Sequence, residues 1–350
     1  MPKPGMKRFV LLSLLALLPV FLLVAFYLIR DPFHVVKPYQ GKIYEDGDTV
    51  SLTVNWGHVS VESFKYFNPQ GHFDSFIFGS SLSGYYLIND WRKHLPDGAR
   101  PFHFNASRET LFGILNKLHY LQSQGVTINN ALIVMEDEML MRRPLDEDVI
   151  FVQHPETTTD VSWWKFHQLY FNAYRHPELV AYLLCPGPMT KTVLDKGFAT
   201  TDITVRDEFI NEGRYVLADS LIAHDPEKFF TPEHIARYSL PLKEMPCQPK
   251  ITPFVEQMLN DIALIFKKMG TDYHIIIPPH YGYEAIDGTD LYKMELAFGQ
   301  QRVHDFSHDA EMGTDLHYYY DDGHLVSQQC ARLMDSAYHI VTLPSPYLKH

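Results

Sequence analysis

Residues 74–84 read Asp-Ser-Phe-Ile-Phe-Gly-Ser-Ser-Leu-Ser-Gly, an apolar run that stops abruptly at a glycine and a cluster of serines. Phe76, Ile77 and Phe78 favour a buried strand, and the helix-compatible segment 85–93 follows the turn. The stretch therefore predicts a strand, a turn and a helix, the repeating unit of α/β folds.

The turn carries hydroxyl groups at a favourable place. In α/β proteins ligands bind at the carboxyl ends of the strands, where a serine is well placed for chemistry. Gly79 permits a sharp turn, and the amides that open the next helix are donors for an anion. We therefore take Ser81 as the candidate nucleophile. The alternative is that Ser80, Ser81 and Ser83 are only an N-cap cluster for that helix.

The composition is that of a folded, acidic protein. The chain has 350 residues, of which 46% are hydrophobic, enough for one large domain with insertions. Lys and Arg total 30 against 42 Asp and Glu, a formal charge of -12. This balance argues against a general nucleic-acid binder, which needs a basic face for the phosphates.

The three cysteines, Cys185, Cys247 and Cys330, form no C-x-x-C pair, which argues against a zinc ribbon or a redox motif. A Cys185–Cys247 disulfide and buried free thiols both remain open.

The run Phe9–Ile29 is apolar except for one serine and Pro19, and as a helix its 21 residues suffice to cross a hydrocarbon core of about 30 Å. Lys3, Lys7 and Arg8 precede it, which places the N-terminus in the cytoplasm and the rest of the chain outside the cell membrane, on the periplasmic or extracellular side. No small residues of a cleavage site end the run, so residues 1–30 are predicted to be a retained anchor. A cleaved signal peptide is the alternative.

The remaining chain divides into two predicted parts. Residues 31–70 are expected to connect the anchor to the main domain, with a hairpin over Gly41–Val54 that turns at residues 45–48. Residues 71–345 are predicted to form one α/β domain, a three-layer sandwich with a mostly parallel sheet. The further elements expected in it are strands at 101–104, 131–135, 274–277 and 302–306 and helices over 111–121, from Thr252-Pro253 onward and over 324–338.

Residues 142–250 break the alternation of strands and helices. They contain Trp163-Trp164, many other aromatic residues and repeated prolines. We predict a large, mainly helical insertion over the site, where substrate specificity is often carried. Ordinary core packing is the expected role of most of its aromatic side chains, and stacking on sugar rings or contact with a membrane surface is the alternative.

A second chemical signal lies late in the chain, in Asp321-Asp322-Gly323-His324. A carboxylate three residues before a histidine can hold the imidazole in the orientation of a general base and stabilise the imidazolium. Together Ser81, His324 and Asp321 supply a nucleophile, a base and an orienting acid.

These motifs resemble the sequence blocks of the SGNH/GDSL hydrolases. The segment 78–82, Phe-Gly-Ser-Ser-Leu, is similar to their first block, with Ser80 where many members have aspartate. The segment 321–324 is similar to their last block, whose D-x-x-H supplies the acid and base of the triad, and 105–107, Asn-Ala-Ser, is similar to the start of the second. The Gly-Ser-Ser form with an amino-terminal anchor most resembles the membrane-bound members of D-alanyl transfer to teichoic acids and of polysaccharide O-acetylation. The similarity covers roughly 70–140 and 251–340.

Two departures concern the oxyanion hole. The family's second block normally offers a glycine amide and its third block G-x-N-D, but 105–110 contains no glycine and the strand at 131–135 continues into Glu-Asp-Glu. A carboxylate cannot donate to an oxyanion. The hole must then use the Ser81 amide, an amide near Ser107 or Arg108, or the Asn105 side chain, or else be incomplete.

The residues and the resemblance lead to two hypotheses. The first is a membrane-anchored extracytoplasmic serine esterase or acyltransferase, acting through Ser81, His324 and Asp321 on an acyl ester of a cell-envelope polymer or lipid-linked donor. The second is a catalytically silent SGNH-like domain that binds polysaccharide or scaffolds a membrane-bound O-acyltransferase complex. We expect no cofactor, no metal and no nucleic-acid partner. A third candidate, less favoured because HExxH is absent, is a metal site with Asp321, His324 and one of His304, His308 or His317.

Overall fold

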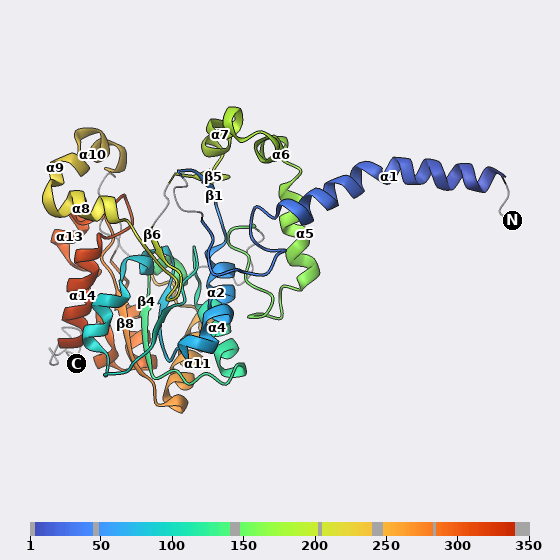
Figure 1. The fold of residues 1–350 in the computed structure, drawn as a ribbon. Coiled ribbons are helices and arrows are strands. Elements are labelled where there is room, and N and C mark those ends of the chain that lie inside the picture. The colour runs from blue at the N-terminus through green and yellow to red at the C-terminus, as the bar shows by residue number, and fades with distance from the viewer. Residues whose placement is uncertain are drawn as a thin grey trace.

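The centre of the molecule is a parallel β-sheet of five strands, in the order β3-β2-β4-β8-β9. The computed structural model describes residues 4–44, 49–140, 148–201, 205–239, 248–282 and 285–339 (Figure 1). The strands are β2 (Ser75–Gly79), β3 (Pro101–His103), β4 (Asn130–Val134), β8 (Asp272–Ile277) and β9 (Val303–Asp305). The strand positions expected from the apolar runs are confirmed to within two residues.

The sheet is covered by helices on both faces, which confirms the predicted three-layer α/β class. Although β2 is buried along its whole length, its side chains alternate: Phe76 and Phe78 pack into one core and Ile77 into the other. The first core includes side chains of α2 (Trp56–Gly71), α4 (Leu111–Ser123), α11 (Pro253–Met269) and α12 (Gly288–Phe298). The second includes side chains of α3 (Ile88–Trp91), α13 (Ala310–Thr314) and α14 (Ser327–His339).

The segment after the serine turn is not the single helix that was expected. It consists of the 3₁₀ turn η1 (Ser81–Tyr85), α3 and a second 3₁₀ turn, η2 (Arg92–His94). Leu87 is extended, which separates α3 from η1. The Ile88 amide at the start of α3 donates to the carboxylate of Glu212, a residue of the insertion, over 2.5 Å. The expectation of one helix over 85–93 was therefore wrong.

The last helix begins three residues later than predicted, at Ser327. The Asp321 carboxylate accepts from the amides of Gly323 and His324, and the Tyr320 amide donates to the His324 carbonyl. These bonds hold residues 320–324 as a turn, so His324 lies on the loop before α14.

Residues 31–70 also differ from expectation. The 16-residue helix α2 starts on Asn55, whose side chain accepts from the His58 amide. The glycine, serine and proline residues of α2 lower its helix propensity, so the sequence did not predict it. The burial of one face of the helix stabilises it in the fold. The predicted hairpin over Gly41–Val54 is not formed by the described residues: β1 (Ser51–Leu52) pairs antiparallel with β5 (Ala199–Thr200), and the expected turn at 45–48 lies outside them.

The insertion is mainly helical, as expected, but it also contains a β-hairpin that the sequence did not predict. Its helices are α5 (Trp163–Ala173), α6 (Pro177–Leu184), α7 (Pro186–Asp195), α8 (Val216–His224), α9 (Pro226–Phe229) and α10 (Pro232–Tyr238). The hairpin joins β6 (Val205–Asp207) to β7 (Glu212–Arg214). The exact limits of the insertion and of the domains remain predictions, since residues 141–147 and 240–247 lie outside the described parts.

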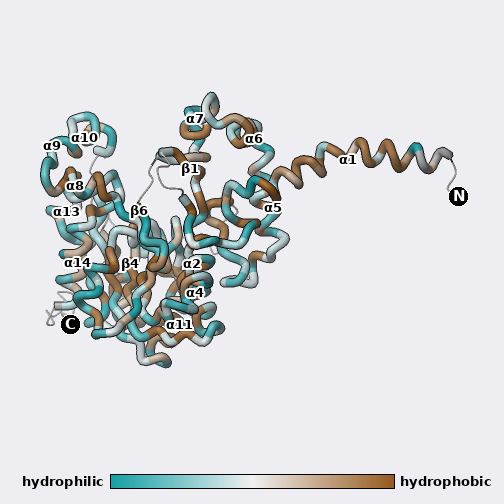
Figure 2. Tube along the Cα trace, in the orientation of Figure 1, coloured by the Kyte–Doolittle hydropathy of each residue, from teal (hydrophilic) through white to brown (hydrophobic). Residues whose placement is uncertain are grey.

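The first helix, α1 (Pro4–Arg30), extends away from the body of the molecule and is apolar along most of its length (Figures 1 and 2). Its segment Arg8–Arg30 has a mean hydropathy of 2.9 and is long enough to cross a membrane. Both a signal anchor and a signal sequence have these properties.

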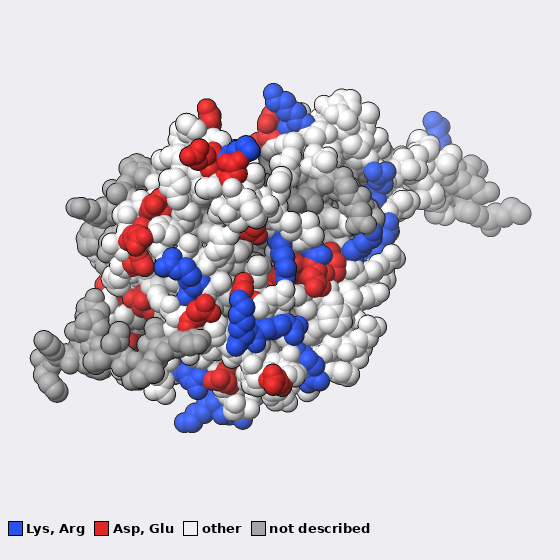
Figure 3. All heavy atoms as spheres, turned by 60° about the vertical axis from the view of Figure 1, so that its left-hand side comes forward, with Lys and Arg blue, Asp and Glu red and all other residues white. Residues whose placement is uncertain are grey.

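The described surface carries charges of both signs (Figure 3), and two of the three cysteines are described. On the face seen in Figure 3, basic and acidic side chains are interspersed. Cys185 is exposed and Cys330 is buried, both as free thiols. Cys247 is outside the described residues, so the Cys185–Cys247 disulfide stays a prediction.

Buried histidines make the fold sensitive to acid. Burial lowers the pKa of His58 and of His103 to about 3 each. The unfolded chain takes up these protons near pH 6.5 but the folded one does not, so stability must fall as pH drops below 6.5 toward 3. We expect each histidine to lower the free energy of unfolding by up to about 2 kcal/mol between pH 7 and 5.

Urea unfolding at a series of pH values measures this effect. His58→Gln should flatten the pH dependence, whereas His119→Gln, at an exposed position on α4, should leave it unchanged. An unchanged slope in His58→Gln would contradict the assignment.

Candidate active site

The three serines of the turn after β2 have different roles. Two of them stabilise the turn, and the third faces the candidate site. The Ser80 side chain accepts from the Leu82 amide over 3.2 Å, and the Ser83 hydroxyl donates to the Ser80 carbonyl over 2.7 Å. Ser80 and Ser83 therefore cap and close the turn. The Ser81 hydroxyl instead faces His324.

Ser81, His324 and Asp321 lie in one hydrogen-bonded row. Ser81 Oγ is 3.0 Å from His324 Nε2. On the other side of the ring, His324 Nδ1 is 2.9 Å from Asp321 Oδ2 and 3.0 Å from Oδ1. Residues 243 positions apart in sequence thus meet at the carboxyl edge of the sheet, in the geometry of a serine, a base and its orienting carboxylate.

The electrostatics of Asp321 favour the ionised carboxylate. Burial by itself raises its pKa, but the hydrogen bond and charge of His324 and the amides of Gly323 and His324 outweigh burial, and the net pKa is lowered. A carboxylate that stays ionised can hold the Nδ1 proton and stabilise an imidazolium.

A cavity of about 270 Å³ opens beside this row. Its lining includes all three residues of the row and three aromatic side chains. The remaining members come mostly from the loop after β3 and from the β6–β7 hairpin. The lining residues are Trp56, Ser81, Gly84, Tyr85, His103, Asn105, Ser107, Arg206, Asn211, Gly213, Tyr215, Asp321 and His324.

Asn105, the side-chain donor expected for an oxyanion, lines the cavity. Ser60 Oγ donates to its carbonyl oxygen over 2.7 Å and lies 3.4 Å from its side-chain Oδ1. Oδ1 lies on the Ser60 side of the amide, and Nδ2 lies 3.7 Å from the position of a Cβ on Gly84, another residue that lines the cavity. The Ser81 amide opens η1, where the first N–H groups of a helix have no partner within the helix.

The other two residues predicted for the oxyanion hole, Ser107 and Arg108, differ in where their side chains lie. Ser107 lines the cavity with Asn105. Arg108 has a left-handed backbone (φ 51°) and places its guanidinium 4.6 Å above the ring of Phe151. The Arg108 side chain is therefore occupied by the insertion, and only its backbone remains a candidate donor.

A buried ion pair holds the loop that carries Asn105. Lys117 Nζ donates to the Glu109 carboxylate over 2.5 Å and to the carbonyls of Phe104 and Asn105 over 3.0 Å each. Both charged side chains are almost fully buried. Such a fully bonded cation fixes the loop, because moving it would leave a buried charge without partners.

The residues of the alternative metal site are occupied elsewhere. His304 Nε2 is 2.8 Å from His274 Nδ1, His308 lies 3.6 Å from Asp305, and His317 lies 2.7 Å from Asp315. Among the described residues, no group of three or more His, Cys, Asp and Glu suits a metal. In the acidic cluster after β4, the Asp137 carboxylate pairs with Lys250.

Sequence reasoning missed the residues that line the cavity from the insertion. Arg206 places its guanidinium 4.3 Å above the ring of Trp56 and donates to Asn211 Oδ1 over 2.8 Å. Tyr215 stacks on Tyr85, with ring centroids 5.6 Å apart, and Tyr85 lies 5.2 Å from the His324 ring. The sequence around them, such as Asn-Glu-Gly at 211–213, is too common to assign to a site.

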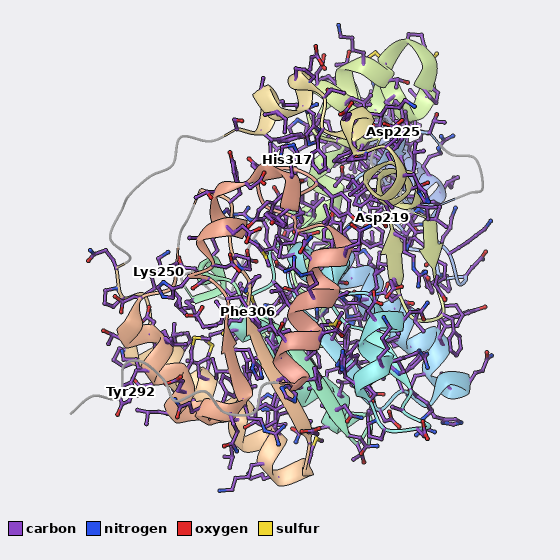
Figure 4. The ribbon with its side chains drawn as sticks, turned by 90° about the vertical axis from the view of Figure 1, so that its left-hand side faces the viewer. Asp219, Asp225, Lys250, Tyr292, Phe306 and His317 are labelled. Atoms are coloured by element: carbon purple, nitrogen blue, oxygen red, sulfur yellow. The ribbon has the colours of Figure 1, made fainter. Side chains whose placement is uncertain are left out.

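The second half of the insertion also contacts the loop of His324. The Tyr320 hydroxyl donates to Asp219 on α8, and the Phe230 ring lies 4.8 Å from His317. Figure 4 shows Asp219 and His317 on these neighbouring elements. Since Tyr320 precedes Asp321 directly, α8 and α9 brace the turn that carries the acid and the base.

Gly79 is required by close packing at the turn. A Cβ there would lie 2.9 Å from the Val134 carbonyl of β4 and 2.7 Å from Ser83 Cβ. We expect Gly79→Ala to cost about 1–3 kcal/mol, because the neighbouring atoms are backbone or tightly held. Chemical denaturation measures the loss, and Gly288→Ala, with no atom within 4 Å of its Cβ, is the control. Equal stability of the two variants would contradict this packing argument.

Comparison of the sequence with known protein families and with curated proteins finds no match.

Proposed function

We propose that this chain is a serine-dependent acyl-transfer enzyme of the SGNH type, held at the outer face of the cell membrane by α1. The observation that carries the proposal is the row Ser81–His324–Asp321, with 3.0 Å and 2.9 Å between the functional atoms, beside an open cavity. Its position at the carboxyl edge of a parallel sheet adds support.

The proposed reaction has two half-steps. His324 Nε2 takes the proton of Ser81 while Oγ attacks the carbonyl carbon of an ester or thioester. The bond to the leaving group breaks, and the alcohol or thiol leaves with the proton from His324. Water or a sugar hydroxyl then attacks the acyl-enzyme and gives its proton to His324. The bond between Ser81 Oγ and the acyl carbon breaks, Oγ takes the proton from His324, and an acid or a new ester is released.

The oxyanion of each tetrahedral intermediate needs donors that are already in place. In this proposal the Ser81 amide and the Asn105 side chain supply them, because both border the cavity next to Ser81 Oγ. The ion pair of Lys117 and Glu109 keeps Asn105 in position.

The aromatic cavity wall favours a polymer or lipid-linked substrate with a sugar unit. Trp56, Tyr85 and Tyr215 border the cavity next to the polar groups of Arg206 and Asn211. Anchoring through α1 would concentrate the domain near envelope polymers and lipid-linked donors.

The same wall supports a second candidate, a silent domain that binds polysaccharide or scaffolds a membrane-bound O-acyltransferase. The candidates are separated by release of p-nitrophenol from p-nitrophenyl esters of increasing acyl length, with the full chain in detergent. The enzyme proposal expects a burst of product equal to the enzyme present, followed by slower turnover. Release no faster than that of Ser81→Ala would favour the silent domain.

A further inference from the structure

The end of α1 is packed against α5 of the insertion. The Tyr27 hydroxyl lies 2.8 Å from His167 Nδ1, and its ring lies 5.8 Å from Phe171 and 5.5 Å from Tyr174, edge to face. Tyr27 is buried, although it belongs to the segment long enough to cross a membrane. Contacts from His167 to Tyr174 mean that most of α5 lies at the level of Tyr27.

The length of α1 places Tyr27 at the outer membrane interface. The segment Arg8–Arg30 has 23 residues, which at about 1.5 Å per residue span about 34 Å. A hydrocarbon core is about 30 Å thick, and about 40–45 Å with the headgroups. With Arg8 and Arg30 at the two polar boundaries, Tyr27 lies one turn inside the outer one. Since α5 contacts Tyr27, α5 must reach the headgroup layer.

The outer side of α5 suits that layer. Trp163 and Trp164 are 44% and 80% exposed, and Trp163 stacks on His167 at 5.8 Å between centroids. Leu184, at the end of α6, is 69% exposed. Tryptophan is the side chain most typical of membrane interfaces, where its ring is apolar and its N–H stays hydrated.

The charge of this stretch fits the same environment. Between Trp163 and Leu184 the only carboxylate is Glu178, which pairs with Lys196, while Lys165 and Arg175 supply positive charge. In a chain with 42 acidic residues, this is an apolar, weakly basic surface next to the membrane helix. Such a surface is attracted to lipid headgroups.

We propose that α5 and α6 form an interfacial segment that docks the domain on the bilayer crossed by α1, with Trp163 and Trp164 inserted among the headgroups. The inference rests on the proposed retention of α1 as an anchor. Docking removes the freedom of the domain to turn about the end of α1 and gives the cavity a fixed orientation to the membrane.

Tryptophan quenching in vesicles tests the proposal with the full chain. The protein is reconstituted into phosphatidylcholine vesicles with or without brominated acyl chains, whose bromine atoms quench only nearby indoles. Trp91 is fully buried in the domain and supplies unquenched emission. We expect brominated lipid to remove the emission of Trp163 and Trp164, and the Trp163→Phe/Trp164→Phe variant to lose most of this quenching.

A matched control uses an exposed aromatic position elsewhere. Tyr292, on α12 beside β9, is 51% exposed (Figure 4). In the variant without Trp163 and Trp164, Tyr292→Trp should add emission that brominated lipid does not quench.

A carbonate wash of the vesicles distinguishes failure of the docking from failure of the membrane anchor. Protein that resists the wash but shows no quenching of Trp163 and Trp164 would overturn the docking alone. Protein that the wash removes would overturn the anchor and the docking together. Quenching of Tyr292→Trp equal to that of Trp164 would also overturn the proposal, because contact would then not be specific to α5.

Discussion

Replacing Ser81 or His324 with alanine is expected to lower ester turnover by about 10⁴-fold or more, and replacing both to lower it no further. The two side chains act as one unit, since the base has no task without the hydroxyl that lies 3.0 Å away. Rates of p-nitrophenyl ester hydrolysis for the two single variants and the double variant measure this non-additivity, with thermal unfolding to verify that each variant is folded.

The chain offers a matched control for His324→Ala. Asp305 and His308 form another D-x-x-H pair, 3.6 Å apart, at the end of β9. His308 is not among the cavity residues, so His308→Ala should keep the activity. Equal losses in the two histidine variants, or full activity in His324→Ala, would remove His324 as the base.

Asn105→Ala is expected to lower kcat by about 100- to 1,000-fold with little change in KM. The reason is that the Nδ2 donor borders the cavity where the oxyanion would form, and one such donor typically contributes a factor of this size. The loss should appear in the acylation of Ser81, which rapid mixing with the aryl ester resolves as a slower burst.

Ser107→Ala separates side-chain from backbone contributions in the same loop. Ser107 borders the cavity. Its backbone amide can donate to the oxyanion, and an alanine at this position keeps that amide. We expect this variant to keep turnover within a few-fold of the native protein. If Asn105→Ala were equally harmless, the hole would have to be built from backbone amides alone.

The parts of the fold that could be predicted are those set by local pattern. The apolar runs in β2 and β4, and Ile275–Ile277 of β8, are buried on both faces of the sheet, and a continuous apolar run of this length is typical of such a strand. Thr252 followed by proline marked the start of α11 because a cap and a first-turn proline act within a few residues.

The parts that were missed depend on contacts between distant segments. α2 contains glycine, serine and proline and is stabilised by packing, and the break before α3 depends on the Glu212 carboxylate, 124 residues away. Likewise, β1 finds its partner in β5 of the insertion and not in its own neighbourhood. A local sequence pattern cannot predict these contacts, because the contacting residues are far apart in the sequence.

The candidate site shows the same division. Ser81 and the Asp321–His324 pair could be identified because each sits in a short motif at a strand or helix boundary. The role of Asn105 depends on Ser60 and Lys117, which orient it from two helices, and Trp56, Arg206 and Tyr215 reach the cavity only through the tertiary fold. Their residue types gave no signal of their own.

The central claim, that His324 activates the Ser81 hydroxyl, is tested most directly by covalent labelling with a fluorophosphonate and peptide mass spectrometry. The folded native chain should carry one adduct, on Ser81, while His324→Ala and the urea-unfolded chain should remain unlabelled and His308→Ala should label normally. A folded native chain without an adduct on Ser81, or equal labelling of His324→Ala, would contradict the account.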